Sequence, residues 1–240
     1  AAGTAYASHG VPMIPIFIYY SMFGFQRIGD LIWAACDCRA RGFMLGGTAG
    51  RTTLNGEGLQ HQDGHSHLFA MAYPTVKAYD PAFVYETTVI MLDGMERMYG
   101  KGEDWIYYIT VYNENYEMPP MPAGCEEGIL KGAYKLRDVP AQAAQGKAAT
   151  KLPPVQLLGS GTILREVIRA AELLAGQFGV SSTVWSVTSW KELRREAQEC
   201  RRWNMLHPTV EPRQSYLEQT IAAADGVFVA ASDHVRAVPE

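Results

Sequence analysis

The first half of the chain alternates between apolar blocks of two different periods. Residues 12–20 form a nearly continuous apolar, aromatic and β-branched run, which predicts a strand buried on both faces. Residues 26–40 repeat apolar side chains at helical spacing, which predicts a helix with one inward face. The inward positions of that helix are Ile28, Leu31, Ile32, Ala35 and Cys36.

The same alternation continues as far as residue 113. Apolar and β-branched runs predict strands at 43–47, 75–80 and 104–113, and helical spacing predicts helices at 66–72 and 82–100. The longer helix should direct one row of side chains inward. That row is Val84, Thr88, Met91, Leu92 and Met95. Because strands alternate with helices, the sequence indicates an α/β fold with a parallel sheet.

Two polar stretches, at 114–125 and 138–154, interrupt the pattern before it restarts. The second stretch is expected to be a flexible surface insertion. Beyond it the sequence predicts three more strands and two more helices, and the first helix should stop at Gly179. The strands are expected at 155–161, 182–189 and 226–232, and the helices at 162–179 and 190–204. The second half therefore predicts another α/β unit.

Composition and charge narrow the classes of partner. Hydrophobic residues make up 48% of the chain and charged residues 19%, which suits a globular core. A net charge of −4 argues against a surface that follows nucleic-acid phosphates. No run reaches the roughly 20 apolar residues that a membrane span needs. Four scattered cysteines are too few for a disulfide framework, so we expect a cytoplasmic protein with no nucleic-acid or membrane partner.

The polar stretch 54–67, LNGEGLQHQDGHSH, concentrates candidate chemistry. It carries two acids, Glu57 and Asp63, and three histidines, His61, His65 and His67. Long loops of this kind are often functional, and imidazoles titrate near neutral pH. From the residues alone, the stretch is a metal site, an acid–base wall around a small substrate, or a solvated loop.

Other residues in and near this stretch favour or disfavour each of these alternatives. Glycines at 56, 58 and 64 argue against the helix that would bring two of the histidines to one face as metal ligands. Arg51 adds a cation that could hold an acidic substrate. Three aromatic residues, Tyr19, Tyr20 and Phe23, cluster where the first strand meets its helix, at the end where α/β sheets bind ligands. They are either core residues or a stacking platform.

Other catalytic motifs are absent from the sequence. It contains no G-x-S-x-G elbow, no Walker loop and no G-x-G-x-x-G after a strand. Residues and spacing alone therefore predict only an α/β protein with a candidate acid–base loop.

Four stretches carry a resemblance to a known family. They are PMIPIFIYYSMFGFQRIGDLIWAACDCRARGF, GGTAGRTTLNGEGLQHQDGHSH, YDPAFVYE and RWNMLHP. Together they resemble the pyruvate decarboxylating component of the homodimeric bacterial pyruvate dehydrogenase complex, a family of the transketolase superfamily. The resemblance covers nearly the whole chain and weakens only at 138–154. It implies a parallel-sheet pyrimidine-binding domain at 1–125, lacking its N-terminal part, and a partial transketolase C-terminal domain at 126–240.

The resemblance also implies an activity. Such enzymes use thiamine diphosphate to decarboxylate pyruvate and pass the acetyl unit to a lipoyl group of the dihydrolipoyl acetyltransferase component. By this resemblance Tyr20, Phe23 and Arg27 bind the cofactor, and His61, Glu57 and Tyr20 are catalytic. Asp63, His65 and His67 then form the substrate-side loop, and none of these residues binds a metal. The expected protein partner within the enzyme is a second subunit of a homodimer.

Two departures qualify this picture. The family binds Mg²⁺ through a G-D-G motif that this sequence lacks, so the metal site is expected in a missing N-terminal domain. The glutamate that activates the cofactor is also expected upstream of Pro12, where the chain has no acid. The resemblance therefore implies a fragment that is inactive alone, binds the cofactor weakly and dimerises or aggregates. The alternatives are another transketolase-type enzyme, or a non-catalytic interaction module of the same fold.

Overall fold

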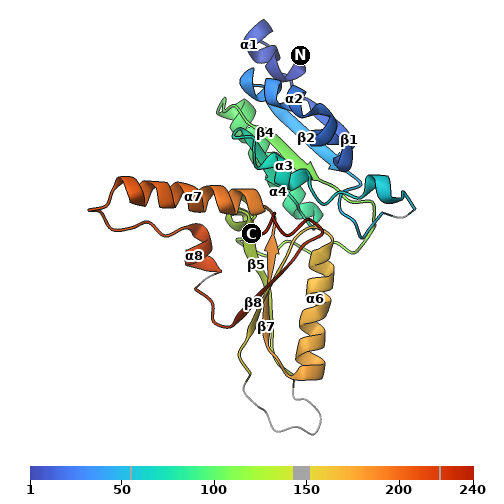
Figure 1. Ribbon diagram of the computed structural model, residues 1–240, viewed down its shortest axis with the longest axis vertical. Helices are drawn as coiled ribbons and strands as arrows, with labels where there is room; N and C mark the ends of the chain where they lie inside the picture. The colour runs from blue at the N-terminus through green and yellow to red at the C-terminus, as the bar shows by residue number, and fades with distance from the viewer. Residues whose placement is uncertain (55, 143–151, 222) are drawn as a thin grey trace. The chain divides into compact units, whose positions relative to one another are not determined.

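The computed structural model describes residues 1–54, 56–142, 152–221 and 223–240 (Figure 1). It divides into two compact units. Unit 1 comprises Ala1–Met121 and the final segment Asp233–Glu240, and unit 2 comprises Pro122–Ser232. Most of the insertion expected at 138–154 lies outside the described residues. Among those described, no helix combines the length and the apolar character needed to cross a bilayer.

Unit 1 is built on a four-stranded sheet in the order β1-β2-β4-β3. The strands are β1 Ile16–Tyr20, β2 Gly42–Gly47, β3 Val76–Tyr79 and β4 Ile106–Thr110, and every pairing among them is parallel. All five residues of β4 are buried, as expected for a central strand of a parallel sheet. The predicted parallel α/β fold is confirmed.

The prediction for the first strand is wrong in one respect. Strand β1 is an edge strand, and Ile18 on it is 68% exposed, so β1 is not buried on both faces. It also begins at Ile16 and not at Pro12. Pro12 and Pro15 lack the backbone N–H group that a ladder needs, which delays the start of pairing.

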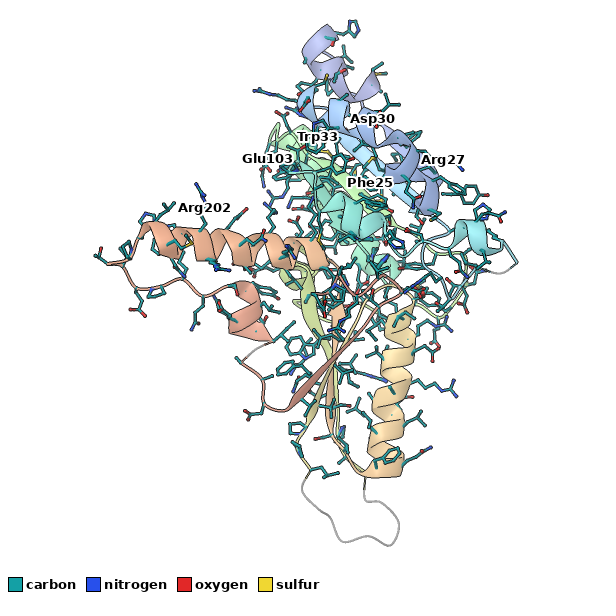
Figure 2. All side chains as sticks on the ribbon, in the orientation of Figure 1. Phe25, Arg27, Asp30, Trp33, Glu103 and Arg202 are labelled. Carbon is teal, nitrogen blue, oxygen red and sulfur yellow. The ribbon has the colours of Figure 1, made fainter. Side chains whose placement is uncertain are left out.

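Helical segments of unit 1 connect or flank these strands. They are η1 Ala2–Thr4, α1 Ala5–His9, η2 Ser21–Phe23, α2 Gly24–Asp37, η3 Leu59–His61, α3 Ser66–Ala70 and α4 Val84–Met95, the last continuing as the π-helix η4 Glu96–Gly100. Helix α2 buries Phe25 and Ile32 in the core and leaves Arg27 exposed (Figure 2). Leu31 was expected to face inward but is 70% exposed, because the buried stripe of this helix is narrower than its apolar stripe. The core itself gathers Phe25, Ile32, Met44, Ala70, Tyr73, Val76, Ala78, Ile106 and Tyr108.

Helix α4 buries a different face from the one predicted. Val84 and Leu92 are each 57% exposed, whereas Glu86, Ile90 and Gly94 are buried. The Glu86 carboxylate accepts the backbone N–H groups at 82 and 83, which fixes the start of the helix. The orientation then follows from Gly94, where a Cβ atom would lie 2.8 Å from the ring of Phe43.

This close approach gives a stability prediction. Gly94→Ala should lower the free energy of unfolding by about 1–3 kcal/mol, because the added methyl group overpacks the contact with Phe43. Gly176→Ala is the matched control, since its Cβ would meet Gln142 only at 3.7 Å. That variant should be neutral or slightly stabilising. Urea denaturation of both variants checks the difference, and equal effects would contradict it.

Unit 2 has a second four-stranded sheet in the order β5-β7-β6-β8. Its strands are β5 Ala133–Val139, β6 Val155–Gly159, β7 Ser182–Val187 and β8 Val227–Ala231. Strand β5, which the sequence pattern did not predict, pairs antiparallel with β7, and the remaining pairings are parallel.

Local sequence features mark where two helices of unit 2 begin or end. The helices of this unit are α5 Glu126–Lys131, α6 Ile163–Leu173 with its π-helical continuation η5 Leu174–Phe178, α7 Trp190–Leu206 and α8 Tyr216–Thr220. Gly179 follows η5 with φ 65°, the left-handed conformation that ends a helix, so the predicted stop is confirmed. Ser189 caps α7 by accepting the backbone N–H of Glu192.

Candidate functional site

Three rings from separate parts of unit 1 meet at the carboxyl end of its sheet. Tyr20 ends β1, Phe23 lies in η2, and His61 ends η3 in the loop that follows β2. The His61 ring centroid lies 4.8 Å from that of Tyr20 and 5.3 Å from that of Phe23. The Arg27 guanidinium carbon lies 4.3 Å from the centroid of the Phe23 ring. The predicted cofactor residues and the predicted catalytic histidine are therefore neighbours.

The backbone fixes the tautomer of His61. Its Nδ1 lies 2.8 Å from the backbone carbonyl oxygen of Glu57, which can only accept a hydrogen bond. Nδ1 therefore carries the proton, and Nε2 of the neutral ring is left with a lone pair. This nitrogen can take a proton from a bound molecule and return it.

A residue that sequence reasoning missed orients the Glu57 side chain. Asn113 Nδ2 donates to Glu57 Oε1 at 2.9 Å. The second carboxylate oxygen, Oε2, is buried and has no hydrogen-bond partner among the described residues. It can accept a donor from a ligand. The only sequence signal for Asn113 is its place shortly after β4, at the edge of the sheet where the three rings meet.

The other predicted loop residues lie in different surroundings. His65 is exposed and stacks on Phe69 with ring centroids 6.3 Å apart. Asp63 is fully buried, and its Oδ1 accepts the backbone N–H groups of His65 at 3.0 Å and Ser66 at 2.9 Å. Burial raises the pKa of Asp63, but the hydrogen bonds from Ser66 and the charge of His234 outweigh it and leave this pKa below its usual value. Asp63 and His65 thus have partners other than the three rings.

His67 belongs instead to a buried cluster with Asp80 and His234. Asp80 Oδ2 lies 3.3 Å from His234 Nε2, and the His67 and His234 ring centroids are 4.6 Å apart. Asp80 Oδ1 also accepts hydrogen bonds from the Thr110 hydroxyl at 2.7 Å and from the Tyr112 hydroxyl. Sequence reasoning missed Asp80 and His234, although Asp80 directly follows β3 at the carboxyl edge of the sheet.

Two opposing effects set the protonation of this pair. Burial disfavours charge on both groups, so by itself it raises the pKa of Asp80 and lowers that of His234. Their mutual attraction outweighs burial: the Asp80 pKa falls well below its usual value and the His234 pKa rises above it. Asp80 and His234 therefore form a buried ion pair.

The same cluster is the metal-ligand grouping found among the described residues. One ligand atom from each of His67, Asp80 and His234 lies within 4.8 Å of the others. Two imidazoles and one carboxylate do not fit Mg²⁺, which prefers oxygen ligands. The carboxylate is also already engaged by Thr110 and Tyr112. The Asp80 carboxylate is thus engaged on Oδ1 by two hydroxyl donors and on Oδ2 by the ion pair with His234.

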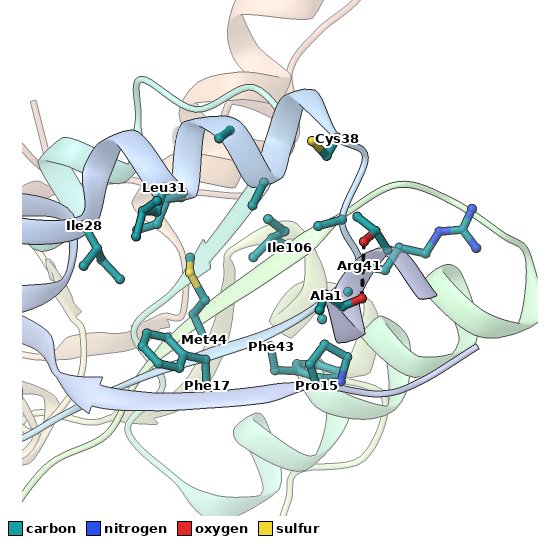
Figure 3. A pocket seen from close by; sticks show the side chains of 17 residues that line it. Ala1, Pro15, Phe17, Ile28, Leu31, Cys38, Arg41, Phe43, Met44 and Ile106 are labelled. Atoms are coloured by element: carbon teal, nitrogen blue, oxygen red, sulfur yellow. Dashed lines mark hydrogen bonds between the residues drawn. The ribbon is translucent and has the colours of Figure 1, made fainter. Parts of the chain in front are cut away.

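An apolar cavity of about 490 Å³ lies elsewhere in unit 1, between β1, β2 and α2 (Figure 3). Its lining includes Phe17, Ile28, Leu31, Phe43 and Met44, and none of the three site rings. The lining also includes Cys38 and Arg41 but no histidine and no carboxylate, and the cavity is separate from the candidate site.

Comparison with known proteins follows the division of the chain. Residues 1–119 match the model of the pyruvate dehydrogenase E1 component middle domain, and residues 132–240 match that of the transketolase-like C-terminal domain. The chain is 57% identical over 240 residues to the pyruvate dehydrogenase E1 component of Cupriavidus necator. The chain belongs to the pyruvate dehydrogenase E1 family. The E1 components of Escherichia coli K12 and Pseudomonas aeruginosa are 57% and 54% identical to it.

Each match covers the whole of this chain and 26% of the E1 component, so the chain spans about a quarter of the length of these three proteins. Solved structures agree on the fold at much lower identity. Transketolase from Leishmania mexicana aligns with a TM-score of 0.65 at 16% identity, covering 93% of this chain and 28% of that one. A split-gene transketolase, described as an inactive β4 tetramer, aligns with a TM-score of 0.57 at 16% identity, covering 97% and 61%. The resemblance read from the sequence is confirmed, both in family and in transketolase-like fold.

Proposed function

We propose that this chain supplies the pyrimidine-binding wall of a thiamine-diphosphate-dependent pyruvate dehydrogenase. In the whole enzyme, pyruvate is decarboxylated and the acetyl unit reductively acetylates a lipoyl group of the dihydrolipoyl acetyltransferase component. The pyruvate dehydrogenase E1 family depends on thiamine diphosphate. The observation that carries the proposal for these residues is the meeting of Tyr20, Phe23 and His61 at the carboxyl end of the sheet.

The residues present suit the aminopyrimidine of that cofactor. Tyr20 is 49% exposed, so its ring offers open aromatic surface on which a flat heterocycle can stack. Tyr20 and Phe23 would hold the heterocycle, and Arg27 adds a positive charge at the rim of Phe23. When bound, thiamine diphosphate supplies a nucleophilic carbon and an electron sink for the decarboxylation of pyruvate.

The chain's own residues then have separate roles. His61 Nε2 exchanges a proton with the bound substrate, because Nδ1 is committed to the Glu57 carbonyl oxygen. Glu57 orients a donor group of the substrate or of the cofactor through its buried Oε2, which has no hydrogen-bond partner in the described part of the chain. Asn113 holds the Glu57 carboxylate in place. Asp63 shapes the loop by accepting the backbone N–H groups of His65 and Ser66 at the start of α3. His65 and His67 remain proposed substrate-side residues.

In the whole enzyme, residues outside this segment would bind Mg²⁺ and the diphosphate of the cofactor. The sequence has no G-D-G motif, and the nitrogen-rich cluster around Asp80 does not fit this ion. A second subunit is the proposed partner within the enzyme. The exposed apolar side chains of Ile16, Phe17 and Ile18 on β1 support it, because such a surface is usually covered. The proposed compartment is the cytoplasm, in keeping with four scattered cysteines.

Cofactor binding tests the ring cluster directly. In a protein of full family length that carries this segment, Phe23→Ala should weaken thiamine diphosphate binding by about 10-fold or more, because it removes a stacking surface. Tyr20→Phe is the matched control, since it keeps the aromatic face and loses only a hydroxyl. Calorimetric titration with Mg²⁺ present measures both affinities. Equal affinities for wild type and Phe23→Ala would refute the pyrimidine-binding role.

Substrate identity needs its own measurement. Steady-state decarboxylation of pyruvate, beside that of a ketose phosphate, separates pyruvate dehydrogenase from another transketolase-type activity. We expect turnover with pyruvate alone. Turnover with the ketose phosphate alone would refute the proposed substrate while leaving the cofactor site in place.

A further inference from the structure

The loop that carries Glu57 and His61 leaves and re-enters the fold through a narrow neck. Gly50 and Asp63 form an isolated antiparallel bridge, with the Asp63 N–H donating to the Gly50 carbonyl oxygen at 3.0 Å. This bridge closes the loop at its base. The loop between Gly50 and Asp63 is rich in glycine, so its backbone has high conformational freedom. Other contacts must therefore hold it in one conformation.

The segment Asp233–Val235, here called the clamp, holds both sides of this neck. On one side, Asp233 Oδ2 accepts the backbone N–H groups of Arg51 at 3.0 Å and Thr52 at 3.2 Å, and the Thr52 hydroxyl at 2.8 Å. On the other side, the Val235 N–H donates to the Gly64 carbonyl oxygen at 2.8 Å. Asp233 is buried, so these bonds are shielded from water.

Arg51 and Gly50 also contact or closely approach the clamp. Arg51 returns a hydrogen bond from Nε to the Asp233 carbonyl oxygen at 2.7 Å, and one from Nη2 to the His234 carbonyl oxygen at 3.3 Å. Gly50 has φ +81°, and a Cβ atom there would lie 2.4 Å from Asp233 Oδ2. Only glycine at this position lets the carboxylate approach the neck so closely.

We propose that Asp233 is a positioning residue that fixes the neck of the loop, and through it the placement of Glu57 and His61 against Tyr20 and Phe23. This role rests on the proposed function of those residues. One carboxylate oxygen gathers three donors from Arg51 and Thr52, on one side of the neck. A misplacement of about 1 Å in a catalytic group can cost about 10²-fold in rate, so a loose neck is expected to slow turnover.

The test uses a protein of full family length that carries this segment. Asp233→Ala should speed amide hydrogen exchange at residues 56–61 and leave exchange in β4 and α4 unchanged. It should lower kcat by about 10–100-fold while changing thiamine diphosphate affinity less than threefold. Asp233→Asn keeps an acceptor oxygen and should restore a large part of both properties. Thr52→Val removes a single hydroxyl and should have a smaller effect of the same kind.

Glu240→Ala is the matched control, because Glu240 lies in the same terminal segment and pairs with the exposed Arg236. Unchanged exchange at residues 56–61 in Asp233→Ala, or an equal effect in Glu240→Ala, would overturn the proposal. Faster exchange with unchanged kcat would also overturn it. If Asp233→Ala unfolds unit 1, Thr52→Val decides by the same two readouts. If His61→Ala keeps full activity while Asp233→Ala loosens the loop, the proposed function fails and the anchoring of the loop stands.

Discussion

Replacing His61 with alanine is expected to lower the turnover of pyruvate by about 10²–10⁴-fold, the range that general acid–base catalysis contributes. The change removes Nε2, the nitrogen left with a lone pair once Nδ1 donates to the Glu57 carbonyl oxygen. Thiamine diphosphate affinity should change little, because the aromatic surfaces of Tyr20 and Phe23 remain. Steady-state kinetics and calorimetry on the same preparation, in a protein of full family length, give both values.

A second substitution at this position separates chemistry from packing. His61→Gln keeps an N–H group that can donate to the Glu57 carbonyl oxygen, and so supports the local backbone. It cannot exchange a proton near neutral pH, so its turnover should be as low as that of His61→Ala. Recovery of activity in His61→Gln would show that the ring only lines the loop. Loss of activity in either variant solely through weaker cofactor binding would also contradict the acid–base role.

The second large effect is expected at the buried ion pair. His234→Ala should destabilise the protein by about 3–5 kcal/mol, because it leaves the Asp80 carboxylate buried without its charge partner. Urea denaturation near pH 6 measures this loss. Glu240→Ala breaks the exposed pair with Arg236 and should change stability by less than about 1 kcal/mol. Equal losses in the two variants would contradict the importance of burial.

The ion pair between Asp80 and His234 should also make the stability of the protein depend on pH. The folded pKa of His234 is raised above 6.5, so its contribution is complete below that pH and is lost as pH rises through the folded value. The folded pKa of Asp80 is lowered below 3.8, so its contribution is complete above that pH and is lost as pH falls through the folded value. The pair should stabilise most between these two limits. Asp80→Asn should remove the decline on the alkaline side and return the His234 pKa, followed by NMR, to 6.5 or below.

Local sequence signals determined the element types of this protein. The apolar run at 104–113 contains β4, and the run at 43–47 covers all of β2 except its first residue. Gly179 ends its helix because glycine reaches the left-handed conformation without a steric penalty. The strand–helix alternation indicated the parallel sheet, since parallel strands need a crossover connection. The family resemblance, read from four stretches of the sequence, predicted Tyr20, Phe23 and His61 as site residues. The structure brings these three rings together.

Exposure followed from tertiary packing and could not be read from the chain. The run at 12–20 is apolar enough for a central strand, yet β1 lies at the sheet edge and Ile18 faces solvent. The buried face of α4 was decided by the close approach at Gly94, where the absence of a side chain matters more than the apolar side chain of Leu92. Periodicity reports which face is apolar, but the partner surface decides which face is covered. Strand β5 was missed because its inward residues are few and charged residues separate them.

Some residues of the candidate site could be predicted from the sequence, and others became evident only in the structure. Residues within one loop, such as Glu57 and His61, could be found because they stand together in the sequence. Asn113, Asp80, His234 and Asp233 could not, because each acts through a partner far along the chain: Asn113 through Glu57, His234 through Asp80, and Asp233 through the backbone at 51 and 52. A hydrogen bond or ion pair depends on a distance of about 3 Å. Sequence sets which groups can make such contacts, and only the folded chain sets which of them come that close.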